Sequence, residues 1–324
     1  MHETSERLLA LLRGQSVARP PLWDPWFAMA RLLRERFDND YLQMAERLGH
    51  AAVPVGIVRV AIDFFDAHRI ALGEPLNGRR WAHARQHADE PDPYWQVQQA
   101  EAGAGRKACN SAGKACWMTM RWCFHAVSGT LGLENFALAC YDNPDLMREA
   151  MAWVEQRNRA AITHLVANVK PDFILLEAQC AHATGPMMDP AMIRELCYEP
   201  TRQTLDLLHN LNLPVVFHTE GKLEPVMDLI LDLGFDAVHG CDPHANDLAE
   251  LIARYNDRIA LAGNMNLGTL ITSTPDQITR ATHDMLRIGA VHRRFIASVN
   301  TVLQDDVPAE NYLAFCQAVR TFTA

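Results

Sequence analysis

From residue 170 onwards, short apolar segments alternate with longer amphipathic segments five times in succession. The apolar segments are predicted strands, at residues 173–177, 214–218, 236–240, 259–263 and 295–299. The segments that follow them have the apolar spacing of helices, at residues 190–211, 223–233, 246–256, 275–288 and 308–322. Strands that are apolar on both faces indicate a parallel sheet covered by helices. The number of these units and the length of the chain therefore predict a single (β/α)8 TIM-type barrel rather than an open sheet.

The first part of the chain is less regular. Residues 3–14 have the spacing of an amphipathic helix, and the prolines that follow indicate a short first strand within residues 19–27. Residues 28–49 are predicted to be helical. The section near 53–123 is predicted to be irregular and β-rich, because short alternating segments are separated by Gly and Pro. No internal repeat or low-complexity linker interrupts the sequence, so we expect one barrel domain over residues 1–324.

Composition excludes several classes of protein. The net charge is −9 and the basic residues are scattered, which argues against nucleic acid as a partner. No apolar run approaches 18 residues, so we expect no membrane span, and the charged N-terminus does not have the pattern of a signal peptide. The eight cysteines have no tight pairing pattern, which indicates a reducing environment. These features predict a cytoplasmic protein.

Polar residues follow strands that are otherwise almost wholly apolar. Active sites of barrels lie at the carboxyl ends of the strands, where the loops begin. The polar residues at these positions are Glu177, His218 with Glu220, His239 with Cys241, Asn264 with Asn266, and Asn300. A barrel with a purely structural role has no need of such a set, so we interpret it as a candidate functional site.

Three of these residues are of types that bind zinc. His218 and Glu220 are two residues apart at a strand end, and Cys241 follows the next strand. Because consecutive barrel strands are neighbours, we predict that the three converge on one zinc ion with an open fourth position. His239 is the alternative ligand if Cys241 points away, and Glu177 is a candidate acceptor for the second ring nitrogen of His218.

Simpler interpretations of the same residues stay open. Glu220 has a nearby cation, Lys222, as an alternative partner, in which case the histidine before it is an ordinary pocket residue. Trp23, Trp26 and Phe27 lie near the end of the first predicted strand and are expected to form the apolar wall of a substrate pocket. The alternative is that their rings pack in the core.

Several segments resemble the uroporphyrinogen decarboxylase superfamily and, within it, the zinc-dependent corrinoid methyltransferases. The segments that carry the resemblance are residues 6–14 with Arg19-Pro20-Pro21, residues 132–136 with 141–146, Gly185-Pro186 through Asp189-Pro190, residues 217–221, and Pro308-Ala309-Glu310-Asn311. The order of these motifs is specific to the superfamily, whereas the activity within it is not. The resemblance implies a barrel that moves a methyl group between a small methylated compound and a corrinoid.

The sequence departs from the family pattern in two ways. Residues 24–31 replace a substrate motif that is rich in arginine in the decarboxylases, which argues against a polyanionic porphyrin substrate. Glu220 stands where the methyltransferases have the cysteine of a His-x-Cys pair, and residues 298–301 lack their later cysteine. We expect Cys241 to compensate, which gives a site with one nitrogen, one oxygen and one sulfur ligand. A carboxylate makes the zinc ion harder and favours activation of an oxygen-containing methyl donor.

The resemblance therefore predicts a zinc-dependent methyltransferase that acts on a small, methoxy-type compound. It implies catalytic roles for His218, Glu220 and Glu177, substrate contacts from His239 and the three aromatic residues, and cofactor contacts from Asn264, Asn266 and Asn300. The chain has no corrinoid-binding DxHxxG stretch, so the corrinoid (cobalamin) is expected to arrive on a separate protein or as the free cofactor. Two alternatives are a decarboxylase-like lyase that acts on a non-porphyrin carboxylate and a non-catalytic barrel that binds a small molecule.

Overall fold

The computed structural model describes residues 1–25, 29–58 and 94–323, so Trp26 and Phe27 lie outside the described residues. The strands are β1 (Ala52–Val58), β2 (Ala115–Arg121), β3 (Phe173–Glu177), β4 (Ala181–His182), β5 (Gly185–Pro186), β6 (Val215–His218), β7 (Ala237–His239), β8 (Ala260–Met265) and β9 (Phe295–Val299). The helices up to the middle of the chain are α1 (Glu3–Leu12), α2 (Ala30–Phe37), α3 (Tyr41–Leu48), α6 (Tyr94–Ser111), α7 (Cys123–Leu131), α8 (Leu133–Asp142) and α9 (Pro144–Ala161), which continues through the π-helical turn η1 (Ile162–Val166) into α10 (Ala167–Val169). The later helices are α11 (Pro190–Asn210), α12 (Glu224–Leu233), α13 (Leu248–Tyr255), α14 (Leu267–Thr272), α15 (Pro275–Gly289) and α16 (Ala309–Thr321).

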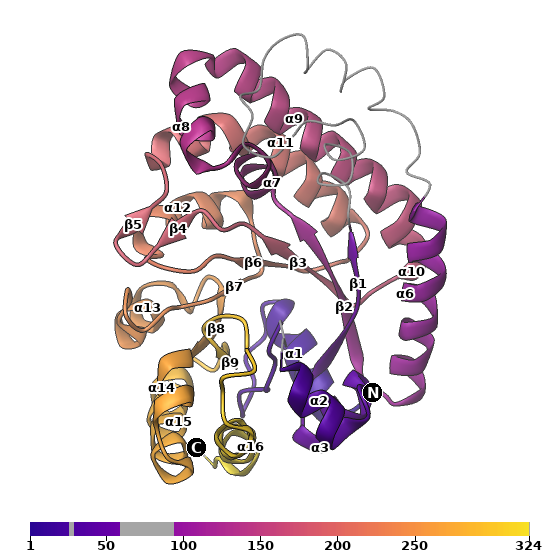
Figure 1. Cartoon of the computed structure of the whole chain (residues 1–324), viewed down its shortest axis with the longest axis vertical. Coiled ribbons are helices and arrows are strands. Elements are labelled where there is room, and N and C mark those ends of the chain that lie inside the picture. Colours follow the sequence, from indigo (N-terminus) through magenta and orange to yellow (C-terminus); the bar gives the residue numbers. More distant parts are fainter. Residues whose placement is uncertain (26–28, 59–93, 324) are drawn as a thin grey trace.

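Seven strands form one parallel sheet in the order β1-β2-β3-β6-β7-β8-β9. The segment around Leu22 lies between the two outer strands, because Leu22 makes parallel bridges to both His50 and Ala297. The Ala51 N–H donates to the Leu22 carbonyl at 2.8 Å, and the Trp23 N–H donates to the Ala297 carbonyl at 3.0 Å. This segment closes the sheet, and the predicted TIM-type barrel is confirmed. Helices surround the strands, with α6, α9 and α11 on one side and α14, α15 and α16 on another (Figure 1).

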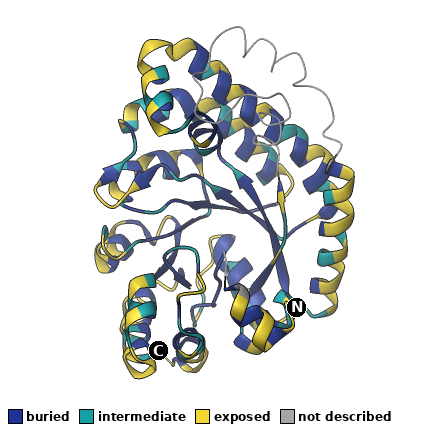
Figure 2. Cartoon of the chain, in the orientation of Figure 1, coloured by how far each residue is buried: buried dark blue, intermediate teal, exposed yellow. Residues whose placement is uncertain are grey.

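The strand side chains alternate between the inside of the barrel and the layer beneath the helices. The interior cluster contains Trp117, Phe173, Leu175, Val216, Ala237, Ala260 and Ile296 together with Leu8, Leu9, Leu11 and Leu12 of α1. The outer cluster contains the intervening residues Met118, Ile174, Phe217, Val238 and Leu261, which pack with the helices. Figure 2 shows the result, with buried strands and helices that expose one side.

Helix α1 covers the amino-terminal end of the barrel. The Ser5 hydroxyl donates to the Ala51 carbonyl at 2.6 Å, next to the start of β1. The same oxygen accepts from the Ala115 N–H at 3.3 Å, at the start of β2. Since the leucines of α1 belong to the interior cluster, this end of the barrel is filled by side chains.

The predicted elements agree with the structure in the second half of the chain. β3 and β9 have the predicted bounds. The bounds of the other three predicted strands differ from the observed ones by at most two residues at either end. Asp189 caps α11 as its position before Pro190 suggests, because its side chain accepts from the Ala191 N–H at 2.9 Å.

The described part of the section near 53–123, which was predicted to be irregular and β-rich, contains two strands and one helix. β1 and β2 are regular barrel strands, and the helix α6 occupies 18 residues between them. Helix α6 contains two glycines, Gly103 and Gly105. Both are accommodated inside the helix, since a helix packed on a sheet tolerates the roughly 1 kcal/mol that each glycine costs.

In residues 1–25, 29–58 and 94–323, no helix combines the length and the apolar character that crossing a bilayer requires.

Two helical glycines provide a test of the packing between α15 and β9. A Cβ on Gly289 would lie 2.2 Å from the ring of Phe295, which is fully buried at the start of β9. Gly289→Ala should therefore lower the free energy of unfolding by about 1–3 kcal/mol through overpacking. Gly103→Ala is the matched control, because nothing lies within 4 Å of its Cβ. It should raise the free energy of unfolding by about 0.5–1 kcal/mol. Urea denaturation measures both, and equal stability of the two variants would contradict the packing described here.

Candidate active site

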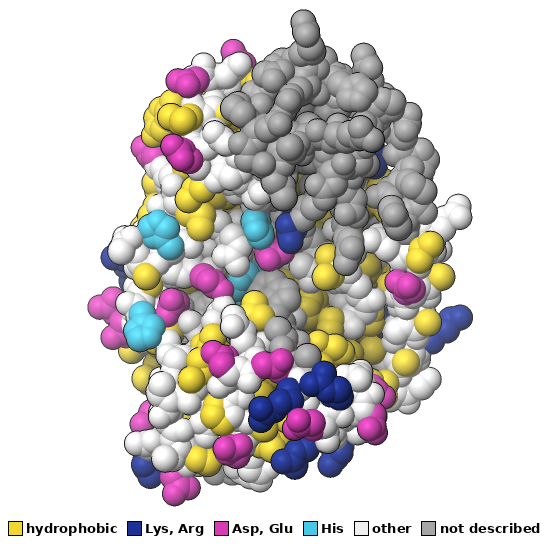
Figure 3. Space-filling view, viewed as in Figure 1, with side chains coloured by type: hydrophobic (Ala, Val, Ile, Leu, Met, Phe, Trp, Pro, Cys, Tyr) yellow, Lys and Arg dark blue, Asp and Glu magenta, His cyan; other side chains and the backbone are white. Residues whose placement is uncertain are grey.

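Four polar residues lie in register across four adjacent strands at the carboxyl end of the barrel. Arg121 pairs with Glu177, Glu177 with His218, and His218 with His239. Residues in register on parallel strands face the same side of the sheet, and the residues two positions before Glu177, His218 and His239 belong to the interior cluster. The apolar interior therefore ends in one polar layer. Basic, acidic and histidine side chains also lie side by side near the middle of the face in Figure 3.

His218 and His239 form a buried hydrogen-bonded pair. Their Nδ1 atoms are 2.7 Å apart, and both side chains are fully buried. Burial holds the pKa of His218 well below its usual range, and the neighbouring His239 and His125 act in the same direction. Burial also lowers the pKa of His239 to about 3. Both imidazoles are therefore neutral at physiological pH, which makes them able to accept a proton or to bind an electrophile.

Further side chains extend this pair in both directions. His239 Nε2 lies 2.9 Å from the Ser298 hydroxyl, which donates to Asp24 at 2.9 Å. His218 Nε2 lies 3.3 Å from the side-chain amide nitrogen of Gln179, which is partly exposed. The pair thus connects a buried carboxylate with the loop that follows β3.

Glu177 was predicted to hold a ring nitrogen of His218. The structure places its carboxylate 3.3 Å from the Arg121 guanidinium and 3.9 Å from His125 Nδ1. Burial lowers the pKa of His125, while the negative charge of Glu177 acts in the opposite direction. Glu177 therefore belongs to a partly exposed charged group at the rim, and His239 is the partner of the His218 Nδ1 atom.

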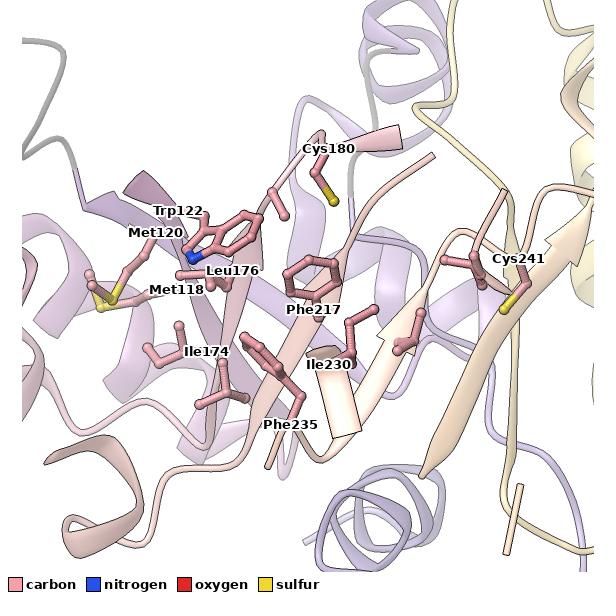
Figure 4. Close-up of a cluster of buried hydrophobic side chains, with 14 of the residues drawn as sticks. Met118, Met120, Trp122, Ile174, Leu176, Cys180, Phe217, Ile230, Phe235 and Cys241 are labelled. Carbon is pink, nitrogen blue, oxygen red and sulfur yellow. The ribbon is translucent and has the colours of Figure 1, made fainter. Parts of the chain in front are cut away.

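Cys241 does not join the histidines. Gly240 and Cys241 both have positive φ angles, of 124° and 46°, so the chain turns as soon as β7 ends. This turn interrupts the alternation of faces, and Cys241 belongs to the outer hydrophobic cluster, part of which Figure 4 shows. Burial in this apolar setting raises the pKa of the Cys241 thiol to about 12, which disfavours the thiolate that zinc requires. The structure therefore does not bring Cys241 together with His218, and its role as a metal ligand stays a prediction from the sequence.

The predicted zinc ligands are not grouped. The Glu220 carboxylate accepts a hydrogen bond from the Thr301 hydroxyl in the loop after β9. Throughout the described ranges, no three His, Cys, Asp or Glu side chains are placed to hold one metal ion. The Nδ1 atoms of His218 and His239 are also too close to share zinc, because two ligands at about 2.0–2.1 Å in tetrahedral geometry lie roughly 3.3 Å apart. As arranged, these residues do not fit the predicted site.

The three asparagines lie on and after β8 and β9. The Asn266 side chain caps α14 by accepting from the Thr269 N–H at 2.9 Å. The Asn300 oxygen accepts from the Leu267 N–H at 3.0 Å, so both residues fix the loop after β8. Asn264 is buried on β8, in register with Ser298. Contact of these asparagines with a cofactor stays a prediction.

A cavity of about 360 Å³ lies beside α3, β1 and β2. Its described lining is mainly apolar and includes Met44, Val53 and Trp117. Asp24 and His50 add polar groups to this lining. A mainly apolar cavity with a few polar groups is typical of a site for a small molecule.

Trp23 was predicted to line the pocket. It is fully buried in the interior cluster, with ring centroids 5.3 Å from Phe173 and 5.8 Å from both Trp117 and His239. The Trp23 ring therefore packs in the core, in contact with His239, as the alternative interpretation of this residue proposed. Among the described residues, Trp117 is the tryptophan that borders the cavity.

Sequence reasoning missed Asp24, Gln179 and Ser298 as members of the site. Ser298 lies two residues after the interior residue Ile296, so strict alternation along β9 identifies it. Gln179 lies beyond the end of β3 and has a φ of 42°, which no strand pattern predicts. Asp24 follows the short closing segment, which has too few residues to show a period.

A closed parallel barrel whose apolar interior ends in a layer of paired ionisable groups has the architecture of an α/β-barrel enzyme. The family model for uroporphyrinogen decarboxylase (URO-D) matches residues 121–322, which is more than half of the chain. The chain belongs to this family, as its motifs predicted.

Comparison with solved structures agrees with this fold. A methyltransferase from Methanosarcina mazei is similar over 99% of both chains, with a TM-score of 0.77 and 16% sequence identity, and at this identity the likeness shows the shared fold. A D-psicose 3-epimerase from Clostridium cellulolyticum H10 covers 89% of this chain and 93% of its own, with 9% identity and a TM-score of 0.44. No curated protein matches the sequence.

The buried histidine pair should make the protein sensitive to acid. The folded pKa of His239 is depressed to about 3 and that of His218 is also low, whereas unfolded histidine titrates near 6.5. Below about pH 6.5 the unfolded chain binds more protons, so stability should fall by about 1.4 kcal/mol per pH unit for each histidine until its folded pKa is reached. Urea denaturation between pH 7 and pH 4.5 measures this slope. The range extends from above the unfolded pKa of histidine to roughly two pH units below it.

The variant His239→Gln should have a shallower slope than the wild type. His209→Gln is the control, because Asp236 raises the pKa of His209 through a hydrogen bond. Stability from His209 is fully present below its unfolded pKa and is lost only as the pH rises through its folded pKa, so its removal should leave the slope below about pH 6 nearly unchanged. A slope in His239→Gln as steep as in the wild type would contradict a neutral buried pair.

Proposed function

We propose that this protein is a methyltransferase that moves a methyl group between a small methylated compound and a corrinoid, beside His218 at the carboxyl end of the barrel. The observation that carries the proposal is the register row of Arg121, Glu177, His218 and His239 above an apolar interior. Family membership and a fold shared with a methyltransferase over nearly the whole chain support it.

The chain supplies two environments that this reaction needs. The apolar cavity beside β1 and β2 suits the body of a small methylated compound, and the Asp24 and His50 groups on its lining can orient a heteroatom. Arg121, Glu177 and Glu220 are partly exposed hydrogen-bonding groups at the rim. Such groups fit the amide-bearing edge of a corrinoid that arrives free or on a partner protein. When bound, the corrinoid supplies the cobalt centre that takes up or gives the methyl group.

His218 is the proton-transfer group in this proposal. Loss of a methyl group from a methoxy compound leaves an oxygen that must gain a proton, and methylation of a hydroxyl or thiol releases one. In the methylating direction, the neutral imidazole accepts the released proton at Nε2 and passes it to solvent. In the demethylating direction, Nε2 takes a proton from solvent and gives it to the departing oxygen. The low pKa of His218 makes the protonated form a strong acid, which favours transfer of the proton to the departing oxygen.

Zinc stays a prediction from the sequence, and no step above depends on it. The ligand set His218, Glu220 and Cys241 does not fit the arrangement of these residues, since Cys241 belongs to the outer cluster. His239, the alternative ligand, has its Nδ1 atom occupied by His218.

The lyase alternative has less support. A decarboxylase that binds a carboxylate substrate is expected to have a basic pocket, and the positive charge of Arg121 is balanced by Glu177 at 3.3 Å. Because Arg121 is paired with Glu177, it does not make the rim of the barrel strongly basic.

The proposal is tested by two variants assayed for methyl transfer between methoxy compounds and cob(I)alamin, which absorbs differently once methylated. His218→Ala should lower the rate by at least about 100-fold, the range expected for loss of a proton-transfer group. Cys241→Ala should retain a rate near that of the wild type, because its side chain lies in the outer cluster.

Circular dichroism and bound zinc are measured on the same samples. Absence of methyl transfer in the wild type with every donor would contradict the proposed reaction. Loss of activity and of bound zinc in Cys241→Ala would instead support the ligand set predicted from the sequence.

A further inference from the structure

A continuous chain of hydrogen bonds runs from the barrel mouth to a buried carboxylate. Its members are Gln179, His218, His239, Ser298 and Asp24. All are buried except Gln179, which is partly exposed. In such a chain each hydrogen can point in only one direction, so the groups at its ends fix the protonation of both rings.

The direction is set first at Ser298. Its hydroxyl has two acceptors, an Asp24 carboxylate oxygen at 2.9 Å and the Val299 carbonyl at 3.1 Å. Neither group can donate, so the Ser298 hydrogen points to one of them and the oxygen accepts from His239 Nε2 at 2.9 Å.

The two rings then follow. A neutral His239 with its hydrogen on Nε2 has an unprotonated Nδ1. That atom lies 2.7 Å from His218 Nδ1, which must therefore carry the hydrogen and donate it. The neutral His218 is left with an unprotonated Nε2.

The other end of this series of hydrogen bonds agrees with this assignment. The side-chain amide nitrogen of Gln179 faces His218 Nε2 at 3.3 Å. An amide nitrogen can only donate, so this orientation of the Gln179 amide matches an accepting Nε2.

Asp24 is the acceptor at the buried end of this series of hydrogen bonds. Its Oδ1 also accepts from the Val299 N–H at 2.7 Å, and its Oδ2 accepts from the Tyr312 hydroxyl at 2.8 Å. Because the Tyr312 hydrogen goes to Asp24, its oxygen accepts from His50 Nε2 at 2.8 Å. Two chains of donors thus converge on one carboxylate, which cannot donate to either while it is ionised.

We propose that Asp24, acting through Ser298 and His239, is a positioning residue that holds His218 in the tautomer with hydrogen on Nδ1 and an accepting Nε2 directed at Gln179. A ligand that replaces the Gln179 amide must therefore itself donate a hydrogen, as a hydroxyl, thiol or ammonium group does. The inference concerns the ground state of the free protein and does not depend on the reaction proposed above.

Nitrogen-15 NMR of the full-length protein tests the tautomers directly, because protonated and unprotonated ring nitrogens have well-separated shifts. His218 and His239 signals are assigned by their disappearance in His218→Gln and His239→Gln. At neutral pH the wild type should show His218 with an unprotonated Nε2 and His239 with an unprotonated Nδ1. A protonated Nε2 on His218 would overturn the proposal without any further variant.

Two substitutions of Asp24 separate acceptor geometry from charge. Asp24→Asn should keep both tautomers, because the Val299 N–H requires the amide oxygen to stay on the side of Ser298. Asp24→Leu removes one of the two acceptors of the Ser298 hydroxyl, which can then donate either to the Val299 carbonyl or to His239. The His218 Nε2 signal should then move towards the protonated position, as a mixture of tautomers. A single unchanged tautomer in folded Asp24→Leu would overturn the role of Asp24.

Two further variants are controls. Gln179→Ala removes the donor at the other end and should leave the tautomers unchanged, because they are set from the Asp24 side. If it alone shifts the His218 signal, Gln179 and not Asp24 sets the tautomer, and the proposal fails. Asp236→Leu removes a carboxylate with similar partners. The Asp236 carboxylate accepts from the Val215 N–H at 2.7 Å and lies 3.0 Å from His209 Nε2. This substitution should not affect His218, and an equal shift there would attribute the effect to general loss of stability.

Discussion

The alternation of side chains along parallel strands is the constraint on which the rest of this structure depends. Residues two apart share a face, so Phe173 and Leu175 fill the barrel and Glu177 comes next on the same face. The same step leads from Val216 to His218. Register then joins these positions across neighbouring strands. The polar layer is therefore a direct continuation of the hydrophobic core, and its position is as rigid as that core.

Burial makes the hydrogen bonds of this layer obligatory. A buried polar group without a partner costs roughly 1–3 kcal/mol, so a layer of neutral histidines is stable only if each ring nitrogen is matched. Here Ser298, which donates to Asp24, is the hydrogen-bond partner of His239 Nε2. Gln179, in the loop after β3, is the partner of His218 Nε2. The cost of burial thus selects one arrangement of hydrogens, and that arrangement gives His218 its chemical character.

The sequence predicted the barrel and the strand ends well, because both follow from a period of two along apolar strands. It therefore found His218, His239 and Glu177. It failed where the backbone leaves this period: Cys241 follows two positive φ angles and turns into the outer cluster. Asp24 comes from a closing segment too short to be periodic, and it reaches Ser298 only through the closure of the barrel. Neither the long-range closure of the barrel nor the backbone conformation of a turn after a strand can be predicted from the period of apolar residues alone.

Hydrogen–deuterium exchange with and without methylcobalamin tests most directly whether the polar layer is where a ligand binds. If it is, amides that follow the strand ends, at residues 178–182, 219–223 and 240–243, should exchange more slowly when the corrinoid is present. Amides of α1, which covers the opposite end of the barrel, should be unaffected. Protection confined to α1 and the amino ends of the strands, or absent everywhere at saturating corrinoid, would contradict this account.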